Sequence, residues 1–367
     1  MFGRGFRIAT IRGIPVNVDA SWLWIAALAL YIRSRDLQSL FPELDATGAL
    51  LYAAFGALLF FGSVFLHELA HAVTARLSNI RVGGITLVFF GGFTEARSEE
   101  RGPGPAFAIA AMGPATSLVL GGVFWSLSRL LGGWDHPATA LLGYVGVLNA
   151  LMAGFNVLPG LPLDGGRMLQ SAVWRFTGNR GTGTRIAARA GMGVGILLFV
   201  AAALEVTRED VSDALWLGII GLFVFQGARA SERQVTHSAR LADATVADAM
   251  DPPPPTVPAD LTLSETLDRY LRGHEGEAFP VIESDGSVIG MVSFGSARDL
   301  GARDPLRPAR DAMIPLEHVL VAHPDERLDQ VSGKLGSGRS ALVLRDGKLV
   351  GAITGSGVAR WATSGTR

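Results

Sequence analysis

The chain has 367 residues, of which 49% are hydrophobic and only 18% are charged, and its mean hydropathy is +0.33. Soluble proteins carry about 25% charged residues, so this composition indicates a membrane protein. The formal net charge of -1 excludes the basic surplus that nucleic-acid binding requires. The chain has no cysteine, so a metal ion would have to be bound by histidine and carboxylate groups.

Long apolar segments recur up to about residue 230, and charged residues become frequent after it. The apolar segments cover 18–32, 49–77, 104–131, 138–160, 188–206 and 213–228. Most of them are long enough, at ~1.5 Å per residue, to cross a hydrocarbon core of about 30 Å. We therefore expect a polytopic α-helical membrane domain with about six transmembrane helices. The first and fifth segments are short and prolines interrupt the fourth, so one or two of them could be partial or re-entrant.

The distribution of arginine predicts the orientation of this domain. Fifteen arginines lie near segment ends on the side of the N-terminus, and only four lie on the opposite side: Arg33, Arg35, Arg129 and Arg208. The positive-inside rule then predicts that both termini are cytoplasmic, in agreement with an even number of spans. The N-terminal segment has no small-residue cleavage site after a short apolar core, so we expect it to be retained.

Residues 80–95 do not have a helical pattern. Paired glycines flank a short run of β-branched and aromatic residues, IRVGGITLVFFGGFTE, which favours a β-hairpin. Since this segment lies between two apolar spans, its backbone would have to pair with itself or with other parts of the protein at the membrane boundary.

The motif HELAH, residues 67–71, lies in the second apolar segment. On a helix, His67 and His71 project from one face, where both imidazoles can bind one Zn²⁺. Glu68 beside them can accept a proton from water activated by the metal and return it to a departing amine. The stretch from residue 46 to residue 75 contains no other charged residue. Because burying a charge in lipid costs about 3 kcal/mol, a metal site is favoured over a structural histidine pair.

A catalytic zinc site needs a third protein ligand and an open fourth position. Asp164 is the best candidate, because it lies in the Pro- and Gly-rich segment NVLPGLPLDGGRML (156–169), which interrupts an apolar region and could line a cavity. Taken alone, Asp164 is better explained as the cap of a helix that starts at Gly165, because Asp is a favoured cap residue. Taken with the two histidines, an aspartate at membrane depth is better explained as a ligand.

The C-terminal part contains an internal repeat, formed by residues 246–293 and 309–354. Both stretches predict a short helix, a strand, an amphipathic helix and two strands joined by an Asp-Gly turn, at 285–286 and 346–347. This order resembles a pair of CBS domains, which form a pseudo-symmetric α/β dimer that often binds adenine nucleotides.

One departure from the CBS pattern argues against nucleotide binding. In nucleotide-binding members, a Thr or Ser after the last strand is followed three residues later by an Asp that holds the ribose. Here Ser293 leads to Ser296, and Thr354 leads to Gly357.

The combination of HELAH with NVLPGLPLDGG is similar to the site-2 protease family, in its branch with C-terminal CBS domains. The resemblance covers nearly the whole chain. It implies a zinc ion held by His67, His71 and Asp164, with Glu68 as the catalytic base. It also implies that Asn156 and Pro162 position the substrate strand or the oxyanion, although Asn156 could instead bond between helices. The hairpin at 80–95 resembles the family's membrane-inserted β element, whose free edge could pair with an unwound substrate.

Several glycines indicate close packing of helices. Gly113-Pro114 matches a signature of the same family and could mark such packing. Gly191, Gly193 and Gly195 lie in the fifth apolar segment, where packing is favoured over a binding site.

These observations predict four regions: a transmembrane metalloprotease domain at 1–232, a linker at 233–245, and CBS repeats at 246–303 and 304–363. The expected activity is that of an intramembrane zinc endopeptidase in regulated intramembrane proteolysis, with the CBS pair as a regulatory module and possible homodimer contact. The resemblance implies a single-span membrane substrate such as an anti-sigma or pro-sigma factor, and a location in the bacterial cell membrane with the CBS pair in the cytoplasm.

The alternative is a CBS-regulated membrane metal transporter or metal-binding protein. Glu68 discriminates between the two, because a transporter needs metal ligands but does not need an additional carboxylate next to the first histidine.

Overall fold

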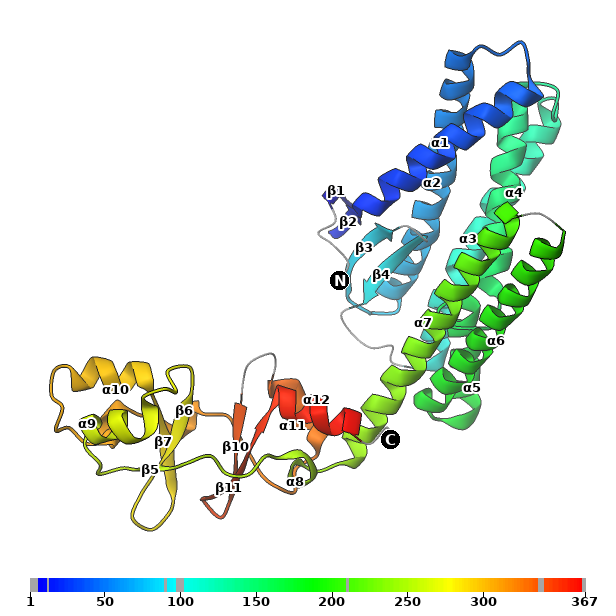
Figure 1. Ribbon diagram of the computed structural model, residues 1–367. Coiled ribbons are helices and arrows are strands. Elements are labelled where there is room, and N and C mark those ends of the chain that lie inside the picture. Colours follow the sequence, from blue (N-terminus) through cyan, green and yellow to red (C-terminus); the bar gives the residue numbers. More distant parts are fainter. Residues whose placement is uncertain are drawn as a thin grey trace. The chain divides into compact units, whose positions relative to one another are not determined.

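The computed structural model describes residues 6–11, 13–88, 91–96, 102–208, 211–335 and 340–364. The chain divides into two compact units, Met1–Val235 and Thr236–Arg367. Figure 1 shows their helices and strands.

Long helices dominate the described part of the first unit. They are α1 Ala20–Leu40, α2 Ala46–Leu77, α3 Pro103–Leu130, α4 Pro137–Val157, α5 Asp164–Thr177, α6 Arg180–Thr207 and α7 Val211–Asp243. Among the described residues, five of these helices (α2, α3, α4, α6 and α7) are long and apolar enough to cross a membrane. The first expected span lies in α1, whose second half carries Arg33, Arg35 and Asp36. The count of six spans therefore stays a prediction.

Local sequence signals begin and end these helices. Side-chain oxygens of Asp19, Asp45 and Asn179 accept hydrogen bonds from backbone N–H groups in the first turns of α1, α2 and α6. Pro137 occupies the first turn of α4, where a missing N–H costs nothing. At the end of α5, Gly178 adopts a left-handed conformation with φ of 70°, which a side chain would strain.

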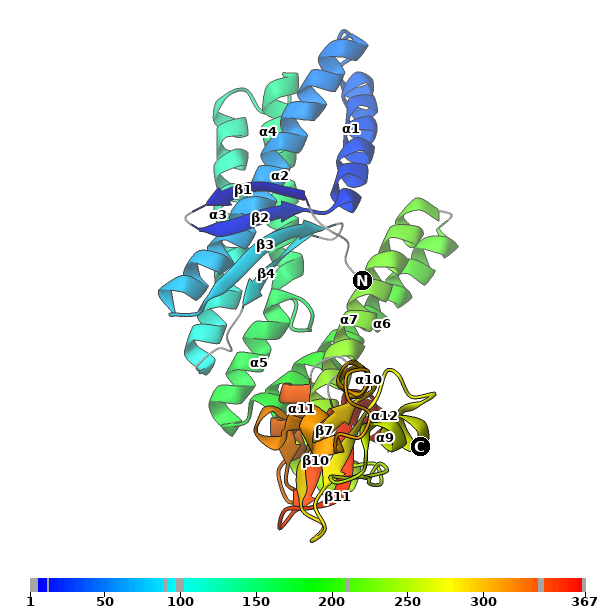
Figure 2. The ribbon, with the colours of Figure 1, turned by 90° about the vertical axis from the view of Figure 1, so that its left-hand side faces the viewer.

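A four-stranded sheet packs against α2. Its strands are β1 Phe6–Ile11, β2 Ile14–Val18, β3 Val82–Val88 and β4 Gly91–Ala96, in the order β1-β2-β3-β4, as Figure 2 shows. The antiparallel pair β3–β4 confirms the hairpin predicted at 80–95, of which residues 89–90 lie outside the described part. The hairpin β1–β2, which pairs with β3 in parallel through β2, was not predicted. Strand β1 is exposed along most of its length, so its sequence lacks a one-sided apolar alternation.

One face of α2 packs against the sheet. The buried residues of this contact are Ile14, Val18, Ile85 and Leu87 of the sheet and Val64 and Ala72 of α2. Because residues four apart lie on one face of a helix, Glu68 falls on the row between Val64 and Ala72. The carboxylate therefore lies on the side of α2 that faces the sheet.

The chain between α4 and α5 is irregular and is held in place by glycine contacts. The backbone N–H of Leu161 donates to the carbonyl of Ala187 in α6 at 3.1 Å. A Cβ atom at Gly191 would overlap the backbone of Leu161, and one at Gly166 would overlap the same segment. Close packing is therefore confirmed at Gly191, whereas Gly193 has no atom within 4 Å of such a Cβ.

The second unit consists of two halves that share one order of elements, except that the second half has the additional elements β8 and η3. The first half contains α8 Val246–Ala249, β5 Val257–Pro258, α9 Leu263–Thr266, the turn η1 Leu267–Leu271, β6 Ala278–Ile282, β7 Val288–Ser293 and α10 Phe294–Gly301. The second contains η2 Ala309–Ala312, β8 Ile314–Pro315, η3 Leu316–His318, β9 Val321–Ala322, α11 Leu328–Leu335, β10 Ser340–Arg345, β11 Lys348–Thr354 and α12 Gly355–Ser364.

The two halves exchange short extended segments. Ile314, which follows the second ‑DAM‑ sequence, pairs with Met291 of β7 in the first half. Reciprocally, Asp251, which follows the first ‑DAM‑ sequence, pairs with Ala352 of β11. Both predicted Asp-Gly hairpin turns form, since β6–β7 and β10–β11 are antiparallel pairs. The repeat in the sequence is thus a repeat in the structure.

The expected linker at 233–245 is largely helical, because α7 continues to Asp243. The residue boundaries proposed for the domains stay predictions.

Candidate metal centre

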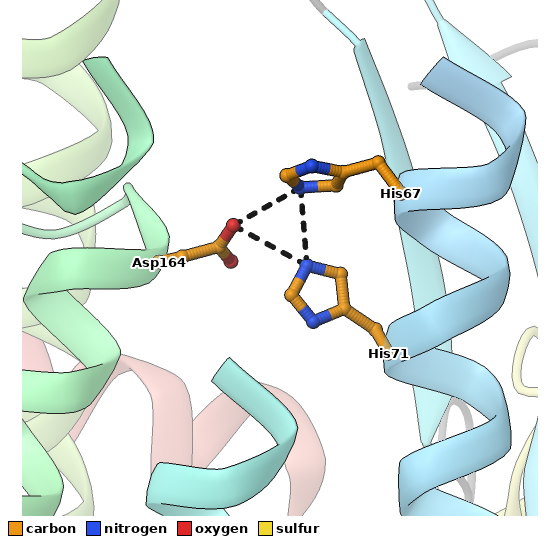
Figure 3. Close-up of side chains that lie close together, drawn as sticks. All are labelled: His67, His71 and Asp164. Carbon is orange, nitrogen blue, oxygen red and sulfur yellow. Dashed lines mark hydrogen bonds and ion pairs between the residues drawn. The ribbon is translucent and has the colours of Figure 1, made fainter. Parts of the chain in front are cut away.

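Two helices that are far apart in the sequence bring three potential ligand atoms together (Figure 3). Nε2 of His67 and Nε2 of His71 project from α2 and are 3.2 Å apart. Oδ2 of Asp164, at the start of α5, lies 3.1 Å from Nε2 of His67 and 3.3 Å from Nε2 of His71. Both histidines are only 4% exposed. The three residues form a triangle of donor atoms in which both histidines are buried and Asp164 is partly buried.

The size of this triangle fits a zinc ion. In a tetrahedral site with zinc–ligand bonds of about 2.0–2.1 Å, two ligand atoms lie about 3.3–3.4 Å apart. The three observed separations, 3.1, 3.2 and 3.3 Å, are close to that value. Within the described ranges, this is the group of histidine and acidic residues that has the spacing for a metal ion.

The hydrogen bonds of the imidazoles also favour a cation. The carbonyl oxygen of Ile109 can only accept, so Nδ1 of His71 carries a proton and donates it at 2.6 Å. In a neutral ring, Nε2 of His71 then presents its lone pair to Asp164. Nδ1 of His67 lies 2.8 Å from the hydroxyl of Ser117, which can accept a proton from this ring or donate one to it. Lone pairs at these distances repel one another unless a proton or a metal cation lies between them. The donor set therefore fits a metal ion.

Helix α3 supplies the groups that orient both imidazoles. Ile109, Gly113 and Ser117 are four residues apart and therefore lie along one face of α3. Between the two hydrogen-bonding groups, Gly113 leaves room for the rings, because a Cβ atom there would lie 2.6 Å from Nε2 of His67 and closer still to His71. Such supporting hydrogen bonds fix ring orientation and tautomer in metal sites.

The sequence alone pointed to only part of this support. It singled out Gly113 without a definite role, and it did not indicate Ser117 or Ile109. A serine in an apolar helix is common, and a backbone carbonyl leaves no signal in the sequence.

The structure places Asp164 inside helix α5 rather than at its N-cap. Leu163 occupies the N-cap position of α5, and Asp164 is the first residue of the helix. Its carboxylate is directed to the histidines, as Figure 3 shows. A negative charge at this position is also favoured by the helix dipole. The geometry thus supports the interpretation as a metal ligand rather than as a cap.

Glu68 is 7% exposed and lies one residue after the first histidine. Its side chain is on the row of α2 that faces the sheet, whereas His67 and His71 face α3 and α5. A carboxylate in this position adjoins the metal site without belonging to the triangle.

Of the two expected substrate-binding residues, one lies just before the irregular segment and the other lies within it. Asn156 is half-buried near the end of α4, and Pro162 is exposed in the loop that leads to Asp164. A Cβ atom at Gly227 of α7 would lie 2.8 Å from the Pro162 ring, so this proline packs closely on α7. Their roles toward a substrate stay predictions.

The hydroxyls at the expected nucleotide positions of the CBS pair serve as helix caps. Ser293 Oγ accepts from the backbone N–H of Ser296, and Thr354 Oγ1 accepts from that of Gly357 at 3.0 Å. Absence of nucleotide binding stays a prediction.

Comparison with known proteins shows the family to which the chain belongs. Residues 55–133 and 132–201 match peptidase family M50, and residues 246–300 match the CBS domain. Rip3 of Mycobacterium tuberculosis, which is named a zinc metalloprotease, is 35% identical over 363 residues, or 96% of this chain and 91% of that protein. The protein sll0528 of Synechocystis, also named a zinc metalloprotease, is 35% identical over 302 residues, or 81% of this chain and 78% of that protein.

A solved structure described as a site-2 protease from Methanocaldococcus jannaschii is similar to 62% of this chain and 95% of its own, with 24% identity and a TM-score of 0.44. The HELAH motif lies within the first matched M50 segment, and Asp164 lies within the second. Given the 35% identity along nearly the whole chain, this protein belongs to peptidase family M50, as a multi-pass membrane zinc metalloprotease of the site-2 type with a C-terminal CBS domain.

Proposed function

We propose that this protein is an intramembrane endopeptidase that cleaves a transmembrane segment of a membrane-bound substrate. The observation that carries the proposal is the triangle of His67, His71 and Asp164, with Glu68 adjoining it on the apolar helix α2. Family membership supports peptide hydrolysis with zinc. The apolar character of α2 supports a reaction site at membrane depth.

In the proposed site, His67, His71 and Asp164 hold the zinc ion. The chemistry that zinc supplies there is acidification of water and polarisation of the scissile carbonyl. Glu68 accepts the proton of the attacking water and delivers it to the amide nitrogen when the peptide bond breaks. The Ile109 carbonyl and the Ser117 hydroxyl keep the two imidazoles in the ligating orientation.

The substrate has to be extended before its backbone can react, because the amides of a helix are shielded by their own hydrogen bonds. Strand β4 is an outer strand of the sheet that packs on α2, so its backbone can accept an added strand. The position of Glu68 on the sheet-facing side of α2 supports an approach from this direction. In this proposal, Asn156 and Pro162 contact the substrate strand or the oxyanion.

The biological role that we infer is regulated intramembrane proteolysis of a single-span protein, such as an anti-sigma or pro-sigma factor. The excess of arginine on the side of the N-terminus supports an orientation with both termini and the CBS pair in the cytoplasm. The location that we propose, in keeping with the family resemblance, is the bacterial cell membrane. The CBS pair is proposed as a regulatory module that could also form a homodimer.

The central test compares the wild type with Glu68→Gln, co-expressed with candidate single-span proteins. Glutamine keeps the size of the side chain and removes the base, so we expect zinc content to be retained and cleavage to be lost. Glu205→Gln, on α6 and paired with Arg208, is the matched control and should cleave normally. Cleavage by Glu68→Gln at the wild-type rate contradicts the mechanism.

A second test removes residues 246–367 and compares the rate and the choice of substrate. A regulatory CBS pair predicts a change in at least one of them. If both are unchanged, the CBS pair does not regulate the protease.

A further inference from the structure

A cavity of about 290 Å³ lies between α1, α2 and α4, with one contribution from α7. Its walls are largely apolar and include Leu28, Ile32, Ala57, Phe60, Leu148 and Trp216. None of the residues of the metal centre lines it, and Arg33 is its one charged lining residue. The cavity is therefore a separate site that combines an apolar wall with a single positive charge.

The Arg33 guanidinium is only partly satisfied by the protein. Its Nη1 lies 3.6 Å from Oδ2 of Asp36, and its Cζ lies 3.9 Å from the centre of the Tyr144 ring. Nε and Nη2 are buried and have no hydrogen-bond partner among the described residues. Buried donors of a charged group that have no partner cost free energy, so an acceptor next to them would stabilise the protein.

The two unsatisfied donors belong to one edge of the guanidinium plane. Two parallel N–H groups on one edge of an arginine can bind a carboxylate or a phosphate through two hydrogen bonds. The third nitrogen and the face of the plane are already used by Asp36 and Tyr144. The remaining edge therefore matches one oxyanion.

The position of Arg33 indicates where this oxyanion comes from. Arg33 directly follows the apolar part of α1, and α2 and α4, which bound the same cavity, are long and apolar enough to span a membrane. A charged residue at the end of an apolar segment lies near the depth of lipid headgroups. The cavity volume is at the lower end of small-ligand sites, which suits an acyl chain but not a peptide helix about 10 Å wide.

We propose that this cavity binds one anionic phospholipid, with its phosphate on the Nε–Nη2 edge of Arg33 and an acyl chain along the apolar wall. The lipid supplies the acceptor that the protein lacks. Its removal leaves the two donors unpaired.

The test uses the full-length protein, delipidated in an uncharged detergent and titrated with phosphatidylglycerol or phosphatidylcholine. We expect a preference for phosphatidylglycerol. Arg33→Gln should weaken its binding on the order of tenfold to a hundredfold, as expected for hydrogen bonds to a charged group. Arg33→Lys keeps the charge but lacks the two-donor edge, so it should bind less tightly than the wild type. Arg35→Gln removes the same charge from an exposed position on α1 and should bind normally.

A second pair of variants tests the apolar wall. Ala57→Leu fills part of the cavity and should weaken phosphatidylglycerol binding, whereas Ala54→Leu, on the exposed side of α2, should not. Unfolding temperatures serve as the folding control. Phosphatidylglycerol should raise that of the wild type but not that of Arg33→Gln, and without lipid the two proteins should unfold at similar temperatures.

Three results overturn the proposal. The first is equal binding of phosphatidylglycerol by Arg33→Gln and Arg35→Gln. The second is binding of soluble glycerol phosphate as tightly as phosphatidylglycerol, which assigns no role to the apolar wall. The third is a combined result for Arg33→Gln, in which lipid binding is normal but cleavage of substrates that carry an acidic residue is reduced. In that case the edge of Arg33 binds a peptide and not a lipid.

Discussion

Gly113 of α3 lies directly against the imidazole of His71, so closely that a Cβ atom at Gly113 would overlap Nε2 of that ring. The same atom would lie 2.6 Å from Nε2 of His67. Both nitrogens are directed to Asp164. The absence of a side chain at position 113 therefore gives the two rings the space in which they meet the carboxylate.

Gly113→Ala should abolish zinc binding. The added methyl group has to displace both rings from the triangle, because it is attached to a helix backbone that cannot easily move. Zinc content of the purified protein, measured by elemental analysis, should fall to a small fraction of the wild-type content while helical content is kept. Gly122→Ala is the matched control on α3, since a Cβ there has no atom within 4 Å. A full zinc complement in Gly113→Ala would contradict the geometry of the site.

Ser117→Ala should weaken zinc binding without removing a ligand. The variant loses the hydroxyl that engages Nδ1 of His67 at 2.8 Å. Loss of such a supporting bond typically lowers metal affinity by about 10- to 100-fold. Competition with a chelator of known affinity measures the change. Ser126→Ala, at an exposed position of the same helix, should leave the affinity unchanged. Equal affinities for both variants would show that Ser117 does not orient His67.

Gly191→Ala should destabilise the protein and Gly193→Ala should not, although the two positions are only two residues apart in α6. A Cβ at Gly191 would overlap the Leu161 backbone and displace the loop that leads to Asp164. We expect lower thermal stability and a reduced cleavage rate. Gly193 has open space around it, so alanine there should be neutral or stabilise the protein by up to about 1 kcal/mol. Thermal unfolding and cleavage assays of both variants, side by side, decide the question.

Leu342→Ala should destabilise the CBS unit selectively. Leu342 is 2% exposed and packs with Val288 and Leu344 where the two halves of the unit meet. Removing a buried leucine side chain costs about 2–5 kcal/mol, whereas Leu306→Ala at a 77% exposed position should cost little. Limited proteolysis under increasing denaturant reports the stability of this unit. Zinc content should be the same in both variants, and a parallel loss of zinc would contradict independent folding of the two units.

The parts of this protein that its sequence predicted are those specified by local patterns. Two histidines four residues apart face the same way on any helix, so the HELAH motif predicted a pair of ligands without knowledge of the fold. The hairpin β3–β4 and the Asp-Gly turns of the second unit also follow from short segments whose residues contact one another. Repetition of the same order of elements made the two halves of that unit recognisable.

Other features depend on contacts between distant segments. Strand β1 is largely exposed and is part of the sheet because β2 pairs with β3, some 70 residues later. The support of the imidazoles by Ile109 and Ser117 requires α3 to pack against α2, and one of these contacts is made by a backbone carbonyl. The unsatisfied edge of Arg33 is defined by Tyr144, which lies on another helix.

By itself, the sequence determined that a zinc site of two histidines and one carboxylate was to be expected within an apolar helix bundle, because ligand spacing and hydropathy are properties of short segments. For Asp164 taken alone, a helix cap was the better explanation, and only its combination with the two histidines favoured a ligand. Only the tertiary structure brings this carboxylate to the histidines, with Oδ2 of Asp164 3.1 and 3.3 Å from the two imidazoles, which supports the role of ligand. The physical reason is that this distance depends on the packing of both α2 and α5 against α3, which no local pattern specifies.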